Sequence, residues 1–98
     1  MATLYITEFS SGGPDSRGVQ LQVGKLPAIT SQAVTISGTS AQSAALNANT
    51  RFVRVLSDTA CYLVAGDNPT ATSSNMRILA DTPEYFAVTG GQKLAAIT

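Results

Sequence analysis

Hydrophobic and polar positions alternate within short segments of this chain, and turn-forming residues separate the segments. Val, Ile, Leu, Tyr and Phe recur in runs about every ten residues, with Gly, Pro, Asn, Asp and Ser between them. A period of two places successive side chains on opposite faces of an extended strand. The pattern predicts an all-β fold, in which eight or nine short strands form a single antiparallel β-sandwich, jelly-roll-like, over residues 1–98.

The first two predicted strands flank a segment that has no core-forming residue. Residues 3–9 carry apolar groups on both faces, so we expect this strand to lie between two surfaces. Residues 18–24 place three apolar side chains on one face and two glutamines on the other, which is typical of a half-buried strand. Residues 10–18 between them contain three glycines, a proline and three serines, and this composition predicts a loop or flexible arm.

Two weaker segments follow. After a turn near Pro27, residues 33–37 repeat the strand pattern, with Val34 and Ile36 facing inward. Residues 40–47 are ambiguous, because their propensities are compatible with a helical turn whereas their alternation fits a weak strand. We favour the strand.

The most β-prone region of the chain is residues 50–66. Two strongly apolar runs flank the segment 57–59, so the simplest geometry is a tight hairpin whose two strands form the centre of the sheet. The residues of this hairpin that we expect in the core are Phe52, Val53, Val55, Leu56, Tyr62, Leu63 and Val64.

Turn-forming residues divide the remaining chain into short strands. Asp, Asn and Pro at 67–69 end the preceding strand, and a polar loop follows over 70–75. Three further strands are predicted over residues 76–79, 84–89 and 93–97. Gly90 and Gly91 are expected to form a two-residue hairpin turn between the last two, because glycine tolerates positive φ.

The composition predicts a thin core. Ala, Thr and Ser supply 36 residues, whereas Leu, Ile, Val and Phe supply only 23. Apolar burial contributes roughly 25 cal/mol per Å², and ordering the chain costs on the order of 1.5 kcal/mol per residue. We therefore expect oligomerisation, or docking on a larger assembly, to complete the stability of the fold.

The charge pattern argues against nucleic-acid and membrane partners. Six basic and six acidic residues give a net charge of zero, and only Arg51 and Arg54 form a close basic pair. These two arginines are expected to be ordinary strand-surface or interface residues. The sequence also has no apolar stretch long enough to span a bilayer and no signal-peptide pattern at its start, which predicts synthesis in the cytoplasm.

The residue types required for catalysis or metal binding are sparse. The chain has no histidine to act as a general base or to activate a serine. We expect the carboxylates to cap turns or be solvated: Glu8, Asp15, Asp58, Asp67, Asp81 and Glu84. Asp67 and Asn68 are the only dense pair of oxygen ligands, and a turn explains them better than a metal. The sequence therefore predicts no enzyme, with no catalytic, cofactor or metal site.

The single cysteine and the three tyrosines could each have a functional role or a packing role. Cys61 lies in an apolar run, so packing is favoured over a reactive thiol, and a lone cysteine excludes an internal disulfide. Tyr5, Tyr62 and Tyr85 are candidates for a carbohydrate platform. Each lies beside core-type residues, so packing with the hydroxyl at the rim is favoured.

The string TRFVRVLSDTACYLVAGDNPTATSSNMRILADTPEYFAVTGGQKLAAI resembles the carboxy-terminal half of small virion proteins of tailed bacteriophages. The resemblance covers residues 31–98 and rests on strand and turn formers, whereas residues before 31 match nothing recognisable. It implies a particle component of the capsid cement or decoration type, found in the virion after synthesis in the host cytoplasm. The implied partners are further copies, as a dimer or trimer, and the major capsid protein or another virion protein. A head-tail, tail or fibre component, and a carbohydrate-binding module on a viral fibre, are the alternatives.

Overall fold

The computed structural model describes residues 2–10, 12–14, 20–24 and 26–98, with side chains at 2–10 and 26–98. Within these residues the protein is all-β and contains no helix, as predicted. The ten strands are β1 (Ala2–Phe9), β2 (Gly12–Pro14), β3 (Gln20–Gly24), β4 (Thr30–Ile36), β5 (Ala41–Gln42), β6 (Phe52–Ser57), β7 (Cys61–Gly66), β8 (Met76–Ile78), β9 (Glu84–Ala87) and β10 (Lys93–Ile97).

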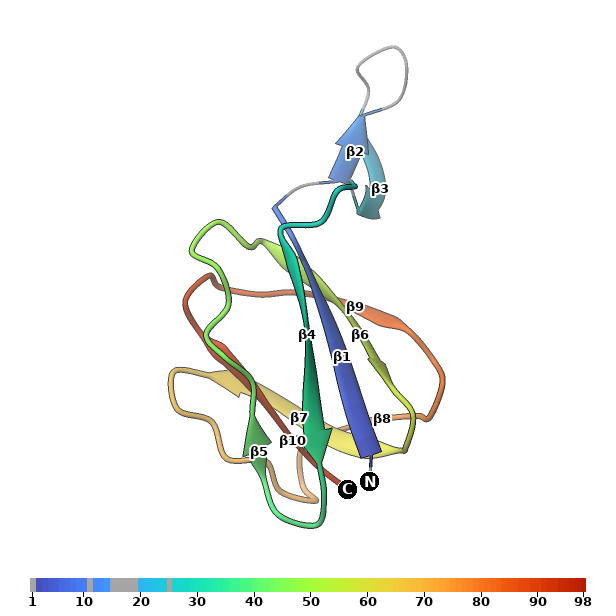
Figure 1. Ribbon diagram of the computed structural model, residues 1–98, viewed down its shortest axis with the longest axis vertical. Helices are drawn as coiled ribbons and strands as arrows, with labels where there is room; N and C mark the ends of the chain where they lie inside the picture. The colour runs from blue at the N-terminus through green and yellow to red at the C-terminus, as the bar shows by residue number, and fades with distance from the viewer. Residues whose placement is uncertain (1, 11, 15–19, 25) are drawn as a thin grey trace.

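Eight of the strands form two antiparallel four-stranded sheets. The order is β4-β1-β6-β9 in one, called sheet A here, and β5-β10-β7-β8 in the other, called sheet C. Strands β2 and β3 form a separate two-stranded hairpin, sheet B, that stands away from one end of sheets A and C (Figure 1). At the opposite end, Ala2 pairs with Ile36, and the Thr98 N–H donates to the Ser37 carbonyl at 2.9 Å, so the chain ends are close together.

The core lies between the two sheets. Alternate residues of β1 and β6, among them Leu4, Ile6, Val53 and Val55, face it from sheet A and are at most 1% exposed. Sheet C contributes its own alternate positions from β7, β8 and β10. Those residues are Cys61, Leu63, Ile78, Leu94 and Ala96. The alternation of buried residues along these strands agrees with the period of two in the sequence.

The predicted hairpin over residues 50–66 is wrong. Both runs are strands, but β6 lies in sheet A between β1 and β9, and β7 lies in sheet C between β10 and β8. Asp58, in the connection, pairs with the first strand, since its N–H donates to the Thr3 carbonyl at 3.2 Å and its Oδ1 accepts from the Thr3 N–H at 2.8 Å. The segment also lacks the Gly or Asn that a two-residue hairpin turn favours, so the chain crosses to the other sheet.

The residues expected in the core of this region divide between the two faces of each strand. Val53, Val55 and Leu63 are buried, as predicted. Four others are only partly buried and alternate with the core positions along β6 and β7. They are Phe52, Leu56, Tyr62 and Val64.

Gly90 and Gly91 do form a turn, but it does not close a hairpin. Strand β9 belongs to sheet A and β10 to sheet C, so this turn also passes from one sheet to the other. Gly91 has φ of 89°, a conformation that favours glycine, and its N–H donates to the Leu46 carbonyl at 3.0 Å.

The predicted arm at residues 10–18 contains a strand. Gly12 pairs with Gly24 and Pro14 pairs with Gln20, so part of the arm is one side of the β2–β3 hairpin. The rest of the arm, residue 11 and residues 15–18, lies outside the described residues. The strand predicted over 40–47 is reduced to the two residues of β5.

Candidate interaction surface

The outer face of sheet A carries three rows of side chains that run across the strands. The middle row, called the apolar row, consists of Ala33 on β4, Tyr5 on β1 and Leu56 on β6, which are paired in register. One row lies nearer the hairpin and one nearer the chain ends. The first is Ser31, Thr7, Arg54 and Tyr85 (the arginine row), and the second is Thr35, Thr3 and Asp58 (the aspartate row).

This outer face leaves large apolar groups open to solvent. Tyr5 is 47% exposed and Tyr85 is 57% exposed, against the expectation that the tyrosines pack. A shallow hollow of about 520 Å³ lies over β4, β1 and β6 and is lined by Tyr5, Ala33, Arg54 and Leu56. Clustered exposed apolar side chains with a polar rim are typical of a contact surface.

The loop that follows β7 covers the β5 side of the outer face of sheet C. The Gln42 amide, on β5, donates at 2.8 Å to Asn68 Oδ1 and to the Pro69 carbonyl. Gln42 lies directly across from Ala95 of β10, which is fully buried although it faces away from the core. The loop therefore shields this side of sheet C, whereas the outer face of sheet A is open across β4, β1 and β6.

The structure brings two of the three tyrosines to one face. Tyr5 and Tyr85 lie on β1 and β9 of sheet A, with Arg54 of β6 paired beside Tyr85. Tyr62 lies on β7 of sheet C and is partly buried, so it does not belong to the same surface. Arg54 is part of this face, and Arg51 precedes β6 as an exposed residue.

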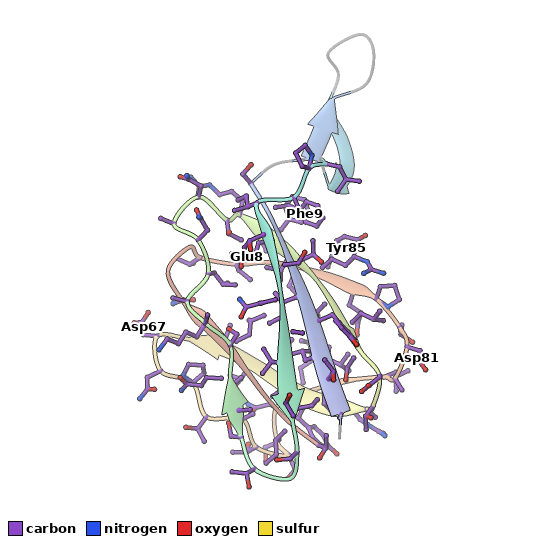
Figure 2. All side chains as sticks on the ribbon, in the orientation of Figure 1. Glu8, Phe9, Asp67, Asp81 and Tyr85 are labelled. Atoms are coloured by element: carbon purple, nitrogen blue, oxygen red, sulfur yellow. The ribbon has the colours of Figure 1, made fainter. Side chains whose placement is uncertain are left out.

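One end of β1 carries a buried carboxylate, which contradicts the expectation that Glu8 is solvated. Glu8 is 1% exposed, and its Oε1 accepts from the Asn47 N–H and from Thr50 Oγ1, both at 2.7 Å. Gln32 Nε2 donates to Oε2 at 3.4 Å. The carboxylate thus joins β1 to the 47–50 turn. Figure 2 shows Glu8 and Phe9 at the end of β1 next to the hairpin.

The sequence gives only one indication that Glu8 is buried. Glu8 follows Ile6 by two positions, and residues two apart on a strand face the same side, so Glu8 shares the face of a core residue. The donors that satisfy the carboxylate come from residues 24 to 42 positions away, which no local pattern reveals.

Cys61 is a packing residue, as predicted. Its side chain is 0% exposed between the sheets, and this burial raises the pKa of the thiol, with a smaller opposing effect of its hydrogen bond to Ser57. We expect no reaction with an aromatic disulfide reagent in the native state at pH 8, and one equivalent of reaction in denaturant. Rapid stoichiometric labelling of the folded protein would contradict this placement.

The described part of the chain offers little else that could support chemistry. Across it, no three Cys, Asp or Glu side chains gather where they could hold a metal ion, and no helix could cross a membrane. Asp67 and Asn68 lie in the exposed loop after β7, where Asn68 binds Gln42 and Asp67 Oδ1 accepts from Gln92 Nε2 at 3.5 Å. These contacts give the pair a structural role in the loop.

Comparison with models of protein families, with curated proteins and with solved structures finds no match to this chain.

Proposed function

We propose that this chain is a non-enzymatic structural protein of a tailed-bacteriophage particle. It acts as a cement or decoration protein that associates with itself and with capsid subunits. A head-tail or tail component would use the same kind of contact. The observation that carries the proposal is the open outer face of sheet A, where Tyr5 and Tyr85 are each about half exposed.

Three features support a role in protein contact. The face of sheet A combines exposed aromatic groups with a single arginine, a composition found at the centres of interfaces. The β2–β3 hairpin stands apart from both sheets (Figure 1), and an isolated two-stranded hairpin is marginally stable in water unless it packs on something else. The resemblance of residues 31–98 to small virion proteins points the same way.

The strand order favours a jelly-roll-like β-sandwich, a fold common in viral capsid proteins. Successive strands from β4 to β7 alternate between sheets A and C, β7 and β8 are neighbours in sheet C, and β9 and β10 alternate again. The first strand, β1, occupies an interior position of sheet A beside β4 and β6.

The proposal predicts a loss of particle binding when the exposed tyrosines are removed. Purified protein is added to particles that lack it, and the bound fraction is measured by sedimentation and mass spectrometry. Tyr5→Ala/Tyr85→Ala is expected to weaken binding at least about tenfold, since truncation of a buried aromatic anchor typically costs 2 kcal/mol or more. Leu79→Ala is the matched control, because Leu79 is 56% exposed and lies outside sheet A. Unchanged binding of the tyrosine variant, or absence of the protein from native particles, would contradict the proposal.

A carbohydrate-binding module on a viral fibre is the second candidate. Tyr5 and Tyr85 share one face with Arg54 between them, and Thr7 and Ser31 add hydroxyls to the same row. Aromatic rings beside hydrogen-bonding groups also suit a sugar ring. Binding on a glycan array that is lost in both Tyr5→Ala and Tyr85→Ala, and kept in Tyr62→Ala, would favour this candidate over the structural role.

A further inference from the structure

We propose that two copies of this chain pack sheet A against sheet A, about a two-fold axis that runs along the apolar row. This inference rests on the self-association in the proposed function and names the surface that performs it. The apolar row, Ala33, Tyr5 and Leu56, crosses three strands in register and lies between two polar rows. A two-fold interface brings each surface patch against itself, so such a patch must be self-complementary.

The charges on the two sides of the apolar row have the required self-complementarity. Arg54 lies on β6 two positions before Leu56, and the exposed Asp58 follows the end of β6, two positions after Leu56 and beside Thr3. They are about 13 Å apart at roughly 3.3 Å per residue. A rotation of 180° about an axis through Leu56, perpendicular to β6 and between the sheets, reverses the strand. Arg54 of one copy then lies over Asp58 of the second copy, twice in the interface.

The same 180° rotation also brings the polar residues of the two outer rows opposite one another. On β1, Thr7 is opposite Thr3 of the second copy, and on β4, Ser31 is opposite Thr35 of the second copy, so hydroxyls meet hydroxyls. Tyr5 lies near the axis and meets its own copy, which permits ring stacking. Packed sheets usually cross at about 30°, which shifts groups near the axis by only a few Å. This shift is within the reach of an arginine side chain.

The charge pattern also selects between two possible axes. An axis parallel to β6 would place Arg54 over Arg54 of the second copy and Asp58 over Asp58, and like charges across an interface are unfavourable. The perpendicular axis pairs opposite charges instead. The face therefore specifies both a partner, a second copy, and its orientation.

The size of the face predicts a weak pair. Four strands about 4.8 Å apart, over about six residues, give a face of roughly 400 Å². Two such faces bury on the order of 800 Å², which is at or below the lower limit of specific interfaces. The pair is then expected to form at micromolar concentration or above. Weak contacts of this kind become effective when many copies are held together on a particle surface.

Charge reversal tests the pairing directly. Sedimentation velocity of the full chain is measured over a range of concentrations at low salt, where exposed charges are least screened. Arg54→Asp alone and Asp58→Arg alone each place like charges in contact twice, and each is expected to raise the dimer Kd about tenfold. The double variant Arg54→Asp/Asp58→Arg restores opposite charges and is expected to return the Kd to within about threefold of the original.

A second experiment keeps the inference testable if a charge variant fails to fold. Ala33→Cys lies on the axis at the edge of sheet A, and a short thiol-to-thiol cross-linker is expected to trap a dimer of this variant. Arg77→Cys, on β8 of sheet C, is the control and is expected to remain monomeric under the same conditions. Native Cys61 is buried and does not compete.

The outcomes separate this inference from the proposed function. A monomer at all concentrations, equal cross-linking of the two cysteine variants, or a double charge variant as defective as either single one overturns the two-fold pairing. Particle binding by the same protein would still support the structural role. Rescue by the double variant, with cross-linking only through Ala33→Cys, supports the pairing even if native particles lack the protein.

Discussion

Glu8→Ala is expected to lower the free energy of unfolding by about 3 kcal/mol, a large fraction of the roughly 5–15 kcal/mol typical of a native domain. The substitution leaves the buried Thr50 hydroxyl and the partly buried Asn47 N–H without their 2.7 Å acceptor. Each buried group without a partner costs about 1–3 kcal/mol. The 47–50 turn also loses its link to β1. Thermal unfolding followed by circular dichroism is expected to show a Tm lower by about 15 °C.

Two further variants show whether the hydrogen bonds are the cause. Glu8→Gln keeps an acceptor for Asn47 and Thr50 but turns an amide donor toward Gln32 Nε2, so an intermediate loss of about 1 kcal/mol is expected. Asp67→Ala removes an exposed carboxylate with one 3.5 Å contact and should change stability by less than about 0.5 kcal/mol. Equal stability of Glu8→Ala and Asp67→Ala would contradict the role assigned to Glu8.

Gly90→Ala is expected to be the second strongly destabilising change, by about 2–3 kcal/mol. A Cβ at Gly90 would overlap the Ala48 carbonyl oxygen and would lie 2.7 Å from the Ala48 carbonyl carbon and 2.8 Å from the Asn47 oxygen. All three atoms belong to the backbone of the turn that Glu8 holds, so no side-chain rotation relieves the contact. Denaturant titration is expected to show a lower midpoint with an unchanged slope.

Neighbouring glycines provide matched controls. Gly91→Ala meets no atom within 4 Å but forces a side chain to φ of 89°, which costs about 1 kcal/mol. Gly38→Ala also meets nothing within 4 Å and should leave stability nearly unchanged. A Gly90 variant as stable as the Gly38 variant would show that the turn is not as tightly packed as described.

The local pattern predicted most strands but not their partners. Residues 3–9 and 93–97 are strands within a residue of the predicted bounds. Positions along β6 alternate between buried and partly buried, although Phe52 and Leu56 were also expected in the core. Alternation fixes which face is buried, but it carries no information on which strand lies alongside. The crossings after Ser57 and after Gly90 were therefore predicted as hairpins, although each passes from one sheet to the other.

The candidate surface was predictable only in part. Tyr5 and Tyr85 were identified from the sequence, but they meet on one face because β1, β6 and β9 are neighbours in sheet A. Leu56 was expected in the core, since an apolar residue in a β-prone run resembles a core residue whichever face it occupies. The exposure of the outer face of sheet A depends on long-range structure, because a loop after β7 covers the β5 side of sheet C and no such loop covers sheet A within the described side chains.

The central claim is that the outer face of sheet A is covered by another protein chain when this protein is in place. An electron-microscopy map of intact particles that carry the protein tests it most directly. The account predicts that density from a neighbouring chain packs on the apolar row and buries Tyr5 and Tyr85. A map in which both tyrosines face solvent, and the contacts with neighbours are made through sheet C, would contradict it.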